Sequence, residues 1–282
     1  MKIAYGTYAT PTLTLEEAIP LLAGMGYEGI EICVNAPKHR GAMLDDFTPE
    51  RRVAIRSQLA EYGLGIPALF MLGGVWTTDG AAHRANLERM RVAAQLARDI
   101  GAEGTPVLAM GFGGPRDEWE QIRGRLAGLL GDCVRVAREE GFILAAEAHS
   151  GAAVDRTERI TWLLDAVSDP HVRLHFDIVH LFLAGEKIED SVRALAPYTA
   201  HTHITDARRH ADGSRELVLL GQGELDSVAY LRAMDAAGWT GFITLEVSMM
   251  VWGAEGYDPV AAAQYSYDTL SNAFAEAGVV RG

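Results

Sequence analysis

The sequence predicts a single (β/α)8 TIM barrel of the α/β class, and three observations lead to it. The chain has 282 residues, a length that suits the about 250 residues typical of such barrels. One unit recurs along it, about 35 residues long: a short apolar strand, a polar loop, and an amphipathic helix that ends near a glycine. The alternative, a doubly wound open sheet, is disfavoured because no G-x-G-x-x-G turn follows the first strand.

The repeated units can be placed in order along the chain. Eight strands are expected at residues 2–7, 29–34, 66–72, 105–111, 142–149, 172–179, 199–205 and 241–247. The clearest helical patterns lie at 14–26, 48–63, 83–101, 117–141, 225–238 and 259–278. Thr or Asp near the helix starts and Gly just past the ends fit capping preferences. No linker or change in composition marks a second domain, so we expect one domain of residues 1–282.

Composition and charge exclude several classes of function. With 38 acidic and 25 basic side chains, the net charge of −13 disfavours binding to nucleic acid or to anionic membranes. No run of about 20 apolar residues predicts a membrane span, and the N-terminus lacks the pattern of a signal peptide. Cys33 and Cys133 form no disulfide framework, so a cytoplasmic location is expected. Lys2, Lys38 and Lys187 lie away from the expected strand ends, which disfavours Schiff-base chemistry.

Ionisable residues follow one another at the ends of the last four expected strands. These are Glu147 in "LAAEAH", Asp177 in "LHFDIVH", His203 in "HTHITD" and Glu246 in "ITLEV". The four are spaced by about one βα unit each. Because TIM barrels place their chemistry at the carboxyl ends of the strands, we expect these side chains to converge at one end of the barrel.

Convergence of three carboxylates and one imidazole predicts a metal site. Without a cation the carboxylates would repel one another, and a buried unpaired carboxylate is costly. Any one of the four alone would more often be a core polar group satisfied by hydrogen bonds or a salt bridge. As a set, the oxygen-rich ligands suit one divalent ion, with Mn²⁺ favoured and Mg²⁺, Co²⁺ or Zn²⁺ as alternatives.

At these residues the chain resembles the sugar phosphate isomerase/epimerase family, the xylose isomerase-like TIM barrels. That family includes ketose 3-epimerases, hydroxypyruvate isomerase, inosose dehydratases and, more distantly, endonuclease IV. The resemblance covers essentially the whole chain and depends on the order of "AAEAH", "HFDIVH", "HTHITDARR", "GQGELD" and "GFITLEV". The loop "TDARRHADG" departs from the ketose epimerases.

The resemblance implies roles for individual residues. Metal ligands would be Glu147, Asp177, His203 and Glu246, and the two glutamates would also be the catalytic acid/base pair. Substrate-binding residues would be His180, three residues after the metal Asp, and Arg209, six after the metal His, with the adjacent Arg208 an equal candidate. From its position two residues beyond Glu147, His149 is expected at the pocket rim and is a further candidate for substrate contact.

The implied activity is that of a metal-dependent sugar or sugar phosphate isomerase/epimerase in carbohydrate metabolism. Proton transfer through a metal-bound cis-enediolate would give an epimer or an aldose–ketose isomer. Loss of a β-hydroxyl from the same site would make the enzyme a lyase or dehydratase acting on a keto-cyclitol or oxidised sugar or glycoside. The substrate is thus a small carbohydrate or cyclitol, and neither its identity nor its phosphorylation follows from the sequence.

Two other functions are weaker alternatives. A non-catalytic barrel subunit would not need both glutamates. An endonuclease IV-like nuclease would need histidines at the ends of strands two to four, where this chain reads "EICVNA", "LFMLGG" and "LAMGFGG".

Other inward-facing or loop residues have mainly structural interpretations. Glu31 and His201 are expected inside the barrel as hydrogen-bonded residues rather than as ligands. The segment "GQGELD" is interpreted as a tight turn with Asp226 capping the next helix, and alternatively as a phosphate-binding loop. Trp76 and the run "SMMVWGAEGYD" are expected to form a pocket wall and a contact in a homo-oligomer.

Overall fold

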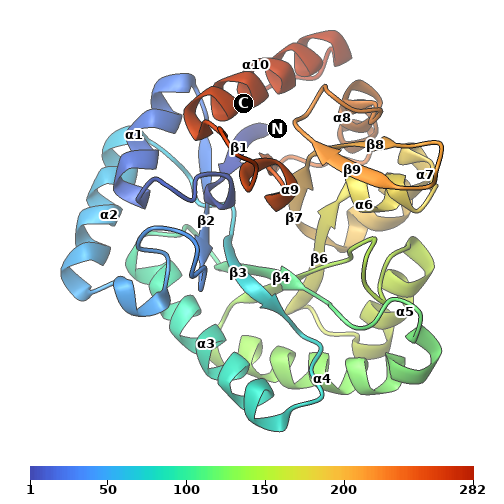
Figure 1. Cartoon of the computed structure of the whole chain (residues 1–282). Coiled ribbons are helices and arrows are strands. Elements are labelled where there is room, and N and C mark those ends of the chain that lie inside the picture. The colour runs from blue at the N-terminus through green and yellow to red at the C-terminus, as the bar shows by residue number, and fades with distance from the viewer.

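A closed barrel of eight parallel strands forms the centre of the computed structural model, which describes all 282 residues (Figure 1). Around the barrel the strands follow the order β1-β10-β7-β6-β5-β4-β3-β2. Their bounds are Lys2–Gly6 (β1), Gly29–Val34 (β2), Leu69–Gly74 (β3), Val107–Gly111 (β4), Ile143–Glu147 (β5), Val172–Asp177 (β6), Thr199–Ile204 (β7) and Phe242–Leu245 (β10). The predicted TIM barrel is therefore confirmed.

Helices surround the strands as an outer ring (Figure 1). They are Leu15–Met25 (α1), Pro49–Tyr62 (α2), Gly80–Asp99 (α3), Trp119–Glu140 (α4), Thr157–Val167 (α5), Ile178–Leu183 (α6), Ile188–Leu195 (α7), Ser227–Ala236 (α8), Met249–Trp252 (α9) and Pro259–Ala277 (α10). Short 3₁₀ turns occupy Thr7–Ala9 (η1), Leu44–Asp46 (η2) and Ala196–Tyr198 (η3). None of the helices has both the length and the apolar character needed to cross a bilayer.

Local sequence signals set most of the helix boundaries. Thr14 and Glu17 form a reciprocal capping box at the start of α1, and Asp258 accepts hydrogen bonds from two backbone N–H groups at the start of α10. Gly26 and Gly278 end these helices in the left-handed conformation that glycine adopts without strain. The apolar faces of the helices pack on the strands in one main core of 66 buried residues.

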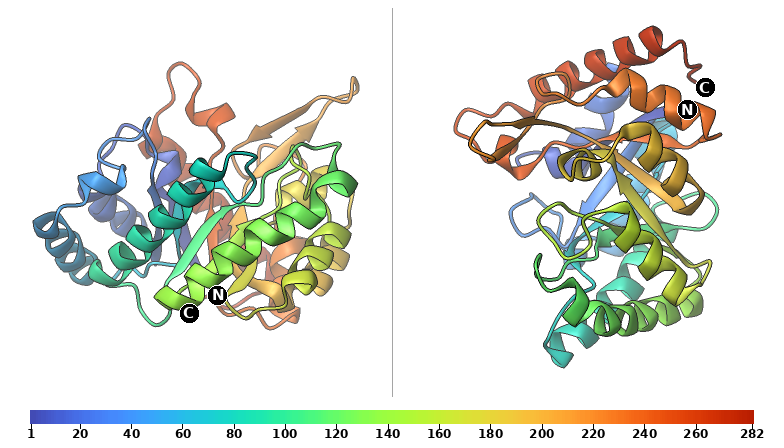
Figure 2. Two further views of the ribbon diagram at one scale, coloured as in Figure 1. Left: turned by 90° about the horizontal axis from the view of Figure 1, so that it is seen from below. Right: turned by 90° about the vertical axis from the view of Figure 1, so that its right-hand side faces the viewer.

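The structure differs from the expected elements in three places. The third strand begins at Leu69 rather than near residue 66, since Pro67 has no N–H for a ladder hydrogen bond. The sixth strand ends at Asp177 rather than at residue 179, and two short helices, α6 and α7, follow it from Ile178 onwards. After β7 comes an unexpected antiparallel hairpin of β8 (Asp206–Arg209) and β9 (Arg215–Val218), which projects from the barrel in Figure 2.

An aromatic ring packs against two glycines at the amino end of the barrel. The Phe242 ring lies against Gly29 and Gly65, which form a backbone bridge between two neighbouring segments. A Cβ at Gly29 would overlap this ring. Glycine is therefore needed there for space and not for its backbone conformation.

Substitution Gly29→Ala is expected to lower the free energy of unfolding by ~1–3 kcal/mol, because the added methyl overpacks the Phe242 ring. Chemical denaturation measures this change. The matched control is Gly24→Ala in α1, where a Cβ meets nothing within 4 Å and no destabilisation is expected. The penalty should shrink in a Phe242→Ala background, and an unchanged penalty there would contradict the steric explanation.

Candidate metal centre and active site

Four ionisable side chains meet at the carboxyl end of the barrel. Glu147 ends β5, Asp177 ends β6, His203 lies near the end of β7 and Glu246 directly follows β10. One donor atom from each lies within 4.8 Å of all the others. The structure thus brings together the four residues that the sequence singled out as metal ligands.

Backbone geometry fixes where these side chains point. Asp177 is both the last residue of β6 and the N-cap of α6, so its Oδ1 accepts a hydrogen bond from the N–H of Val179 at 3.0 Å and its Oδ2 stays free. The N–H of Glu246 donates to the carbonyl of Ile204 at 3.1 Å, which holds the residue beside β7. These local contacts orient the carboxylates before any ligand arrives.

The set is buried and electrostatically crowded. Burial, and then the nearby charge of Glu246, raise the pKa of Glu147 above its usual range and that of Asp177 to about 7. The Nδ1 of His203 lies 3.5 Å from Glu246 and 3.9 Å from Glu147, and neither it nor Asp177 Oδ2 has a hydrogen-bond partner. Separations of this size between unpartnered donors fit a divalent cation bound among them.

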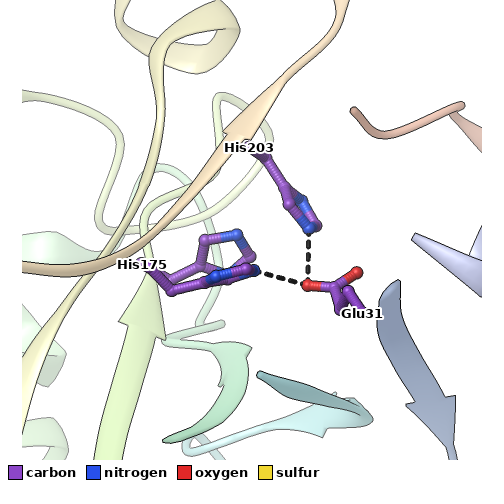
Figure 3. Close-up of side chains that lie close together, drawn as sticks. Glu31, His175 and His203 are labelled. Atoms are coloured by element: carbon purple, nitrogen blue, oxygen red, sulfur yellow. Dashed lines mark hydrogen bonds and ion pairs between the residues drawn. The ribbon is translucent and has the colours of Figure 1, made fainter. Parts of the chain in front are cut away.

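A second cluster lies immediately below the first and shares His203. Glu31, from β2, faces His203 across the barrel interior (Figure 3). Its Oε2 lies 2.8 Å from Nε2 of His203 and 2.5 Å from Nε2 of His201. Both are hydrogen-bond distances, so Glu31 Oε2 is shared by two imidazoles, whereas Glu31 Oε1 has no partner. The hydrogen bonds agree with the structural interpretation of Glu31 and His201.

The network determines which nitrogen of His203 faces the carboxylates. With Nε2 donating to Glu31, only Nδ1 is free towards Glu147 and Glu246. Burial lowers the pKa of His203, but the charges of Glu31 and Glu246 outweigh burial and raise it well above its usual range. Conversely, burial raises the pKa of Glu31, while the charge of His203 and both hydrogen bonds bring it down to about 2. Both shifts favour an ionised Glu31–His203 pair in the metal-free protein.

His175 is the remaining imidazole of the interior. It is fully buried, and neither ring nitrogen has a hydrogen-bond partner. Its ring centroid lies 4.1 Å from that of His203, edge to face, and its Nε2 lies 4.0 Å from Glu147. Burial, and then the charge of His203, lower the pKa of His175 well below its usual range, so this ring is neutral.

The predicted substrate-binding histidines lie beside the four-residue cluster. His180 Nε2 is 3.5 Å from Asp177 Oδ2, and its Nδ1 is 3.3 Å from the hydroxyl of Ser150. The ring of His149 packs on that of His180 with centroids 4.0 Å apart. Ser150 was not singled out by the sequence, because its partner is 30 residues away on another βα unit.

The predicted arginines lie instead on the exposed hairpin. Arg209 pairs with Glu224 at 3.0 Å, and its guanidinium lies 4.4 Å from the ring of Phe182. Arg208 lies 3.5 Å from Glu216. No hydrogen bond or ion pair joins either arginine to the four-residue cluster.

Aromatic side chains form a wall beside the cluster. The rings of Tyr8 and His39 stack with centroids 5.4 Å apart, and Trp252 packs edge-on against both at 5.3 and 5.2 Å. Phe70 completes the wall and lies 5.5 Å from His203. Tyr8 packs edge-on against Phe70 with centroids 5.7 Å apart, and burial, followed by the charge of Glu246, raises the pKa of Tyr8 to about 12. Only Trp252 was singled out from the sequence.

Substitution Glu31→Gln is expected to lower the pKa of His203 in the metal-free protein, because the imidazolium loses the charge of its buried partner. A ¹H–¹⁵N NMR titration of the histidine rings measures this. Glu28→Gln is the matched control, since Glu28 precedes the same strand but contacts Ile3 and Arg281 at the other end of the barrel. An unchanged His203 titration in Glu31→Gln would show that Glu31 does not hold the proton on this ring.

Comparison with known proteins identifies the same barrel fold. The family model described as "Xylose isomerase-like TIM barrel" matches residues 19–271. Among sequence relatives, the L-ribulose-5-phosphate 3-epimerase UlaE of Salmonella paratyphi A is 24% identical over 275 residues, which cover 94% of this chain and 91% of that protein.

Solved structures show the same fold at lower identity. An L-ribulose 3-epimerase superposes with a TM-score of 0.76 at 18% identity, covering 98% of this chain and 95% of the other. The IOLI protein, solved with a bound zinc atom, gives a TM-score of 0.77 at 18% identity and covers 98% of both chains. With nine-tenths of its length matched by the family model, this chain belongs to the xylose isomerase-like TIM barrel family.

Proposed function

We propose that this protein is a divalent-metal-dependent sugar isomerase or epimerase. The observation that carries the proposal is the set of four donors within 4.8 Å of one another, two of which have buried atoms without a partner. Relatives named as L-ribulose-5-phosphate 3-epimerase and L-ribulose 3-epimerase support the reaction class. The proposed ligands are Glu147, Asp177, His203 through Nδ1, and Glu246.

A bound divalent ion, Mn²⁺ by preference, would offset the three negative charges and polarise a sugar carbonyl together with its neighbouring hydroxyl. The residues of the chain would carry out the proton transfers. Glu147 and Glu246 come from strands that are separated in the barrel by β6 and β7, so they approach a substrate from different sides. One glutamate removes the proton from the carbon beside the carbonyl, and the other returns a proton. Return to the same carbon inverts that stereocentre, and return to the neighbouring carbon moves the carbonyl.

His180 would position the substrate. Its Nδ1 is engaged by Ser150, and its Nε2, 3.5 Å from Asp177 Oδ2, would bind a sugar hydroxyl. His149 would contact the same part of the substrate. Arg208 and Arg209 remain predicted contacts, and Arg209 would have to leave Glu224 to reach a substrate. The homo-oligomer remains a prediction, in which the exposed Met249 and Met250 would be part of the interface.

β-Elimination by the same site is the second candidate, and the Ser150–His180 pair favours it. An imidazole held at this position can donate a hydrogen bond to a departing hydroxyl, and the glutamate that has taken the carbon-bound proton can then protonate that hydroxyl. Incubation of the metal-loaded protein in D₂O with ketoses and inososes, followed by NMR, separates the outcomes. Deuterium beside the carbonyl of an epimer or isomer supports the first function, and a dehydrated product supports the second.

Substitution Glu246→Gln is expected to reduce turnover by roughly 10²–10⁴-fold, the usual contribution of a general acid or base. The amide keeps the size of the side chain, so the melting temperature should stay close to that of the wild type. Steady-state kinetics and thermal melts measure the two quantities. Glu255→Gln, an exposed carboxylate nearby in sequence, is the control. Wild-type rates in Glu246→Gln would remove this residue from the mechanism.

Removal of metal by dialysis against a chelator is expected to abolish activity, and Mn²⁺, Co²⁺ or Mg²⁺ should restore it. Without the cation the carboxylates repel one another and a carbonyl is not polarised. Metal analysis should find about one ion per chain, as a single four-ligand site requires. Full activity in protein shown by that analysis to be metal-free would refute the metal dependence.

A further inference from the structure

The second cluster of the barrel interior, which we call the inner cluster, is itself a set of possible metal ligands. Glu31 of β2, His175 of β6, and His201 and His203 of β7 each offer one donor atom within 4.8 Å of the other three. None of these residues is more than 2% exposed. Figure 3 shows Glu31 on one side of the interior and His175 and His203 on the other. The inner cluster therefore links β2 to strands across the barrel.

His175 is the member of the inner cluster that lacks hydrogen bonds. Both of its ring nitrogens are buried without a partner, and so is Oε1 of Glu31. The ring of His175 packs against those of His201 and His203, with centroids 4.7 and 4.1 Å away. A buried polar atom without a partner is unfavourable, and an ion that it binds is one explanation for its presence. The inner cluster thus has ligand atoms that no contact within the protein uses.

Strand register separates the inner cluster from the four-residue cluster above it. On the neighbouring strands β6 and β7, His175 is aligned with His201, and Asp177 is aligned with His203. Because residues two apart on a strand face the same side, His175 and His201 lie one layer deeper than the other pair. Only His203 belongs to both clusters, with Nε2 facing the inner cluster and Nδ1 facing the carboxylates above.

The two clusters differ in the metal ions that they suit. The four-residue cluster offers three carboxylates and one imidazole, whereas the inner cluster offers three imidazoles and one carboxylate. Carboxylate oxygen suits Mn²⁺ and Mg²⁺, and imidazole nitrogen suits Zn²⁺. Four protein ligands without an open position are typical of structural zinc sites, which are tetrahedral. The inner cluster has the ligand composition and the burial of such a site.

We propose that the inner cluster is a structural zinc site, with ligands from Glu31, His175, His201 and Nε2 of His203. In the metal-free protein, ring protons join His201 and His203 to Glu31 at 2.5 and 2.8 Å. Zinc takes the place of these two protons, which pass to solvent, and the ligands move apart slightly to surround it. His175 then gains the partner that it lacks.

The ion acts on the site above it through His203. With Nε2 bound to zinc, the ring still presents Nδ1 to Glu147 and Glu246. When both clusters hold an ion, His203 loses its second ring proton and bridges them. The zinc also ties β2 to β6 and β7, so it stabilises the folded state. This site goes beyond the proposed function, because its occupation requires neither substrate nor turnover.

The first experiment counts the ions in chelator-treated protein that is reloaded with one metal at a time. Mn²⁺ should give about one ion per chain, because it favours the oxygen-rich cluster, and excess Zn²⁺ should give about two and raise the melting temperature further. Because the inner ligands are buried, zinc is supplied both to the folded protein and in the growth medium of the expressing cells. One zinc per chain by both routes would overturn the inference.

Single substitutions locate the second ion. His175→Gln and His201→Gln should each lose one zinc per chain and keep one Mn²⁺, whereas Asp177→Asn should lose Mn²⁺ and keep one zinc. His83→Gln is the matched control, because His83 is also buried but pairs with Asp132 between the outer helices α3 and α4. A second zinc that persists in both histidine variants of the inner cluster would lie elsewhere and would overturn the inference.

A spectroscopic probe tests the wild-type protein, so it does not depend on the folding of any variant. Four-coordinate Co²⁺ absorbs visible light much more strongly than six-coordinate Co²⁺, and it substitutes for zinc. Protein already loaded with Mn²⁺ should gain strong visible bands after one equivalent of Co²⁺ is added, and Zn²⁺ should abolish them. Weak bands alone would place the added ion in an oxygen-rich site of higher coordination and would overturn the inference.

Discussion

The structure depends on how negative charge is accommodated at the carboxyl end of the barrel interior. Glu31 and Glu246 lie on opposite sides of the single imidazole of His203, and Glu147 and Asp177 share the same space. Burial of this many carboxylates has a low free-energy cost only if each contacts a cation or a set of hydrogen-bond donors. His203 satisfies Glu31 through one nitrogen, which leaves its other nitrogen and the three remaining carboxylates as an incomplete set. The arrangement also requires a glycine in β1, because a Cβ at Gly6 would lie 2.7 Å from Glu31 Oε1.

Much of this site could be predicted from the sequence, because its signals are local. Alternation along a strand determines which residues face inward, and the βα repeat places Glu147, Asp177, His203 and Glu246 at successive strand ends. Gathering of the four at one end then follows from barrel closure. The inward direction of Glu31 was also visible from its strand.

Contacts between distant strands and the course of the loops could not be predicted from the sequence. Glu31 and His203 are 172 residues apart on strands separated by β1 and β10, so their hydrogen bond exists only in the closed barrel. Tyr8 lies in the turn η1 and His39 in the loop after β2, and neither segment has a periodic pattern that predicts the contact between them. The β8–β9 hairpin was missed because "DARR" and "RELV" are charged and lack the alternating apolar face that indicates a strand.

The hairpin itself has a consequence for how such a barrel can diversify. Asp206 and Glu224 tie its base to the loop before α8, whereas all residues from 208 to 215 are exposed. Barrel closure between β7 and β10 does not involve its tip. The segment is therefore a replaceable module: its length and sequence can change through insertion, deletion or recombination while the four-residue cluster stays in register. Selection can thus act on the hairpin independently of selection on the strand ends beneath it.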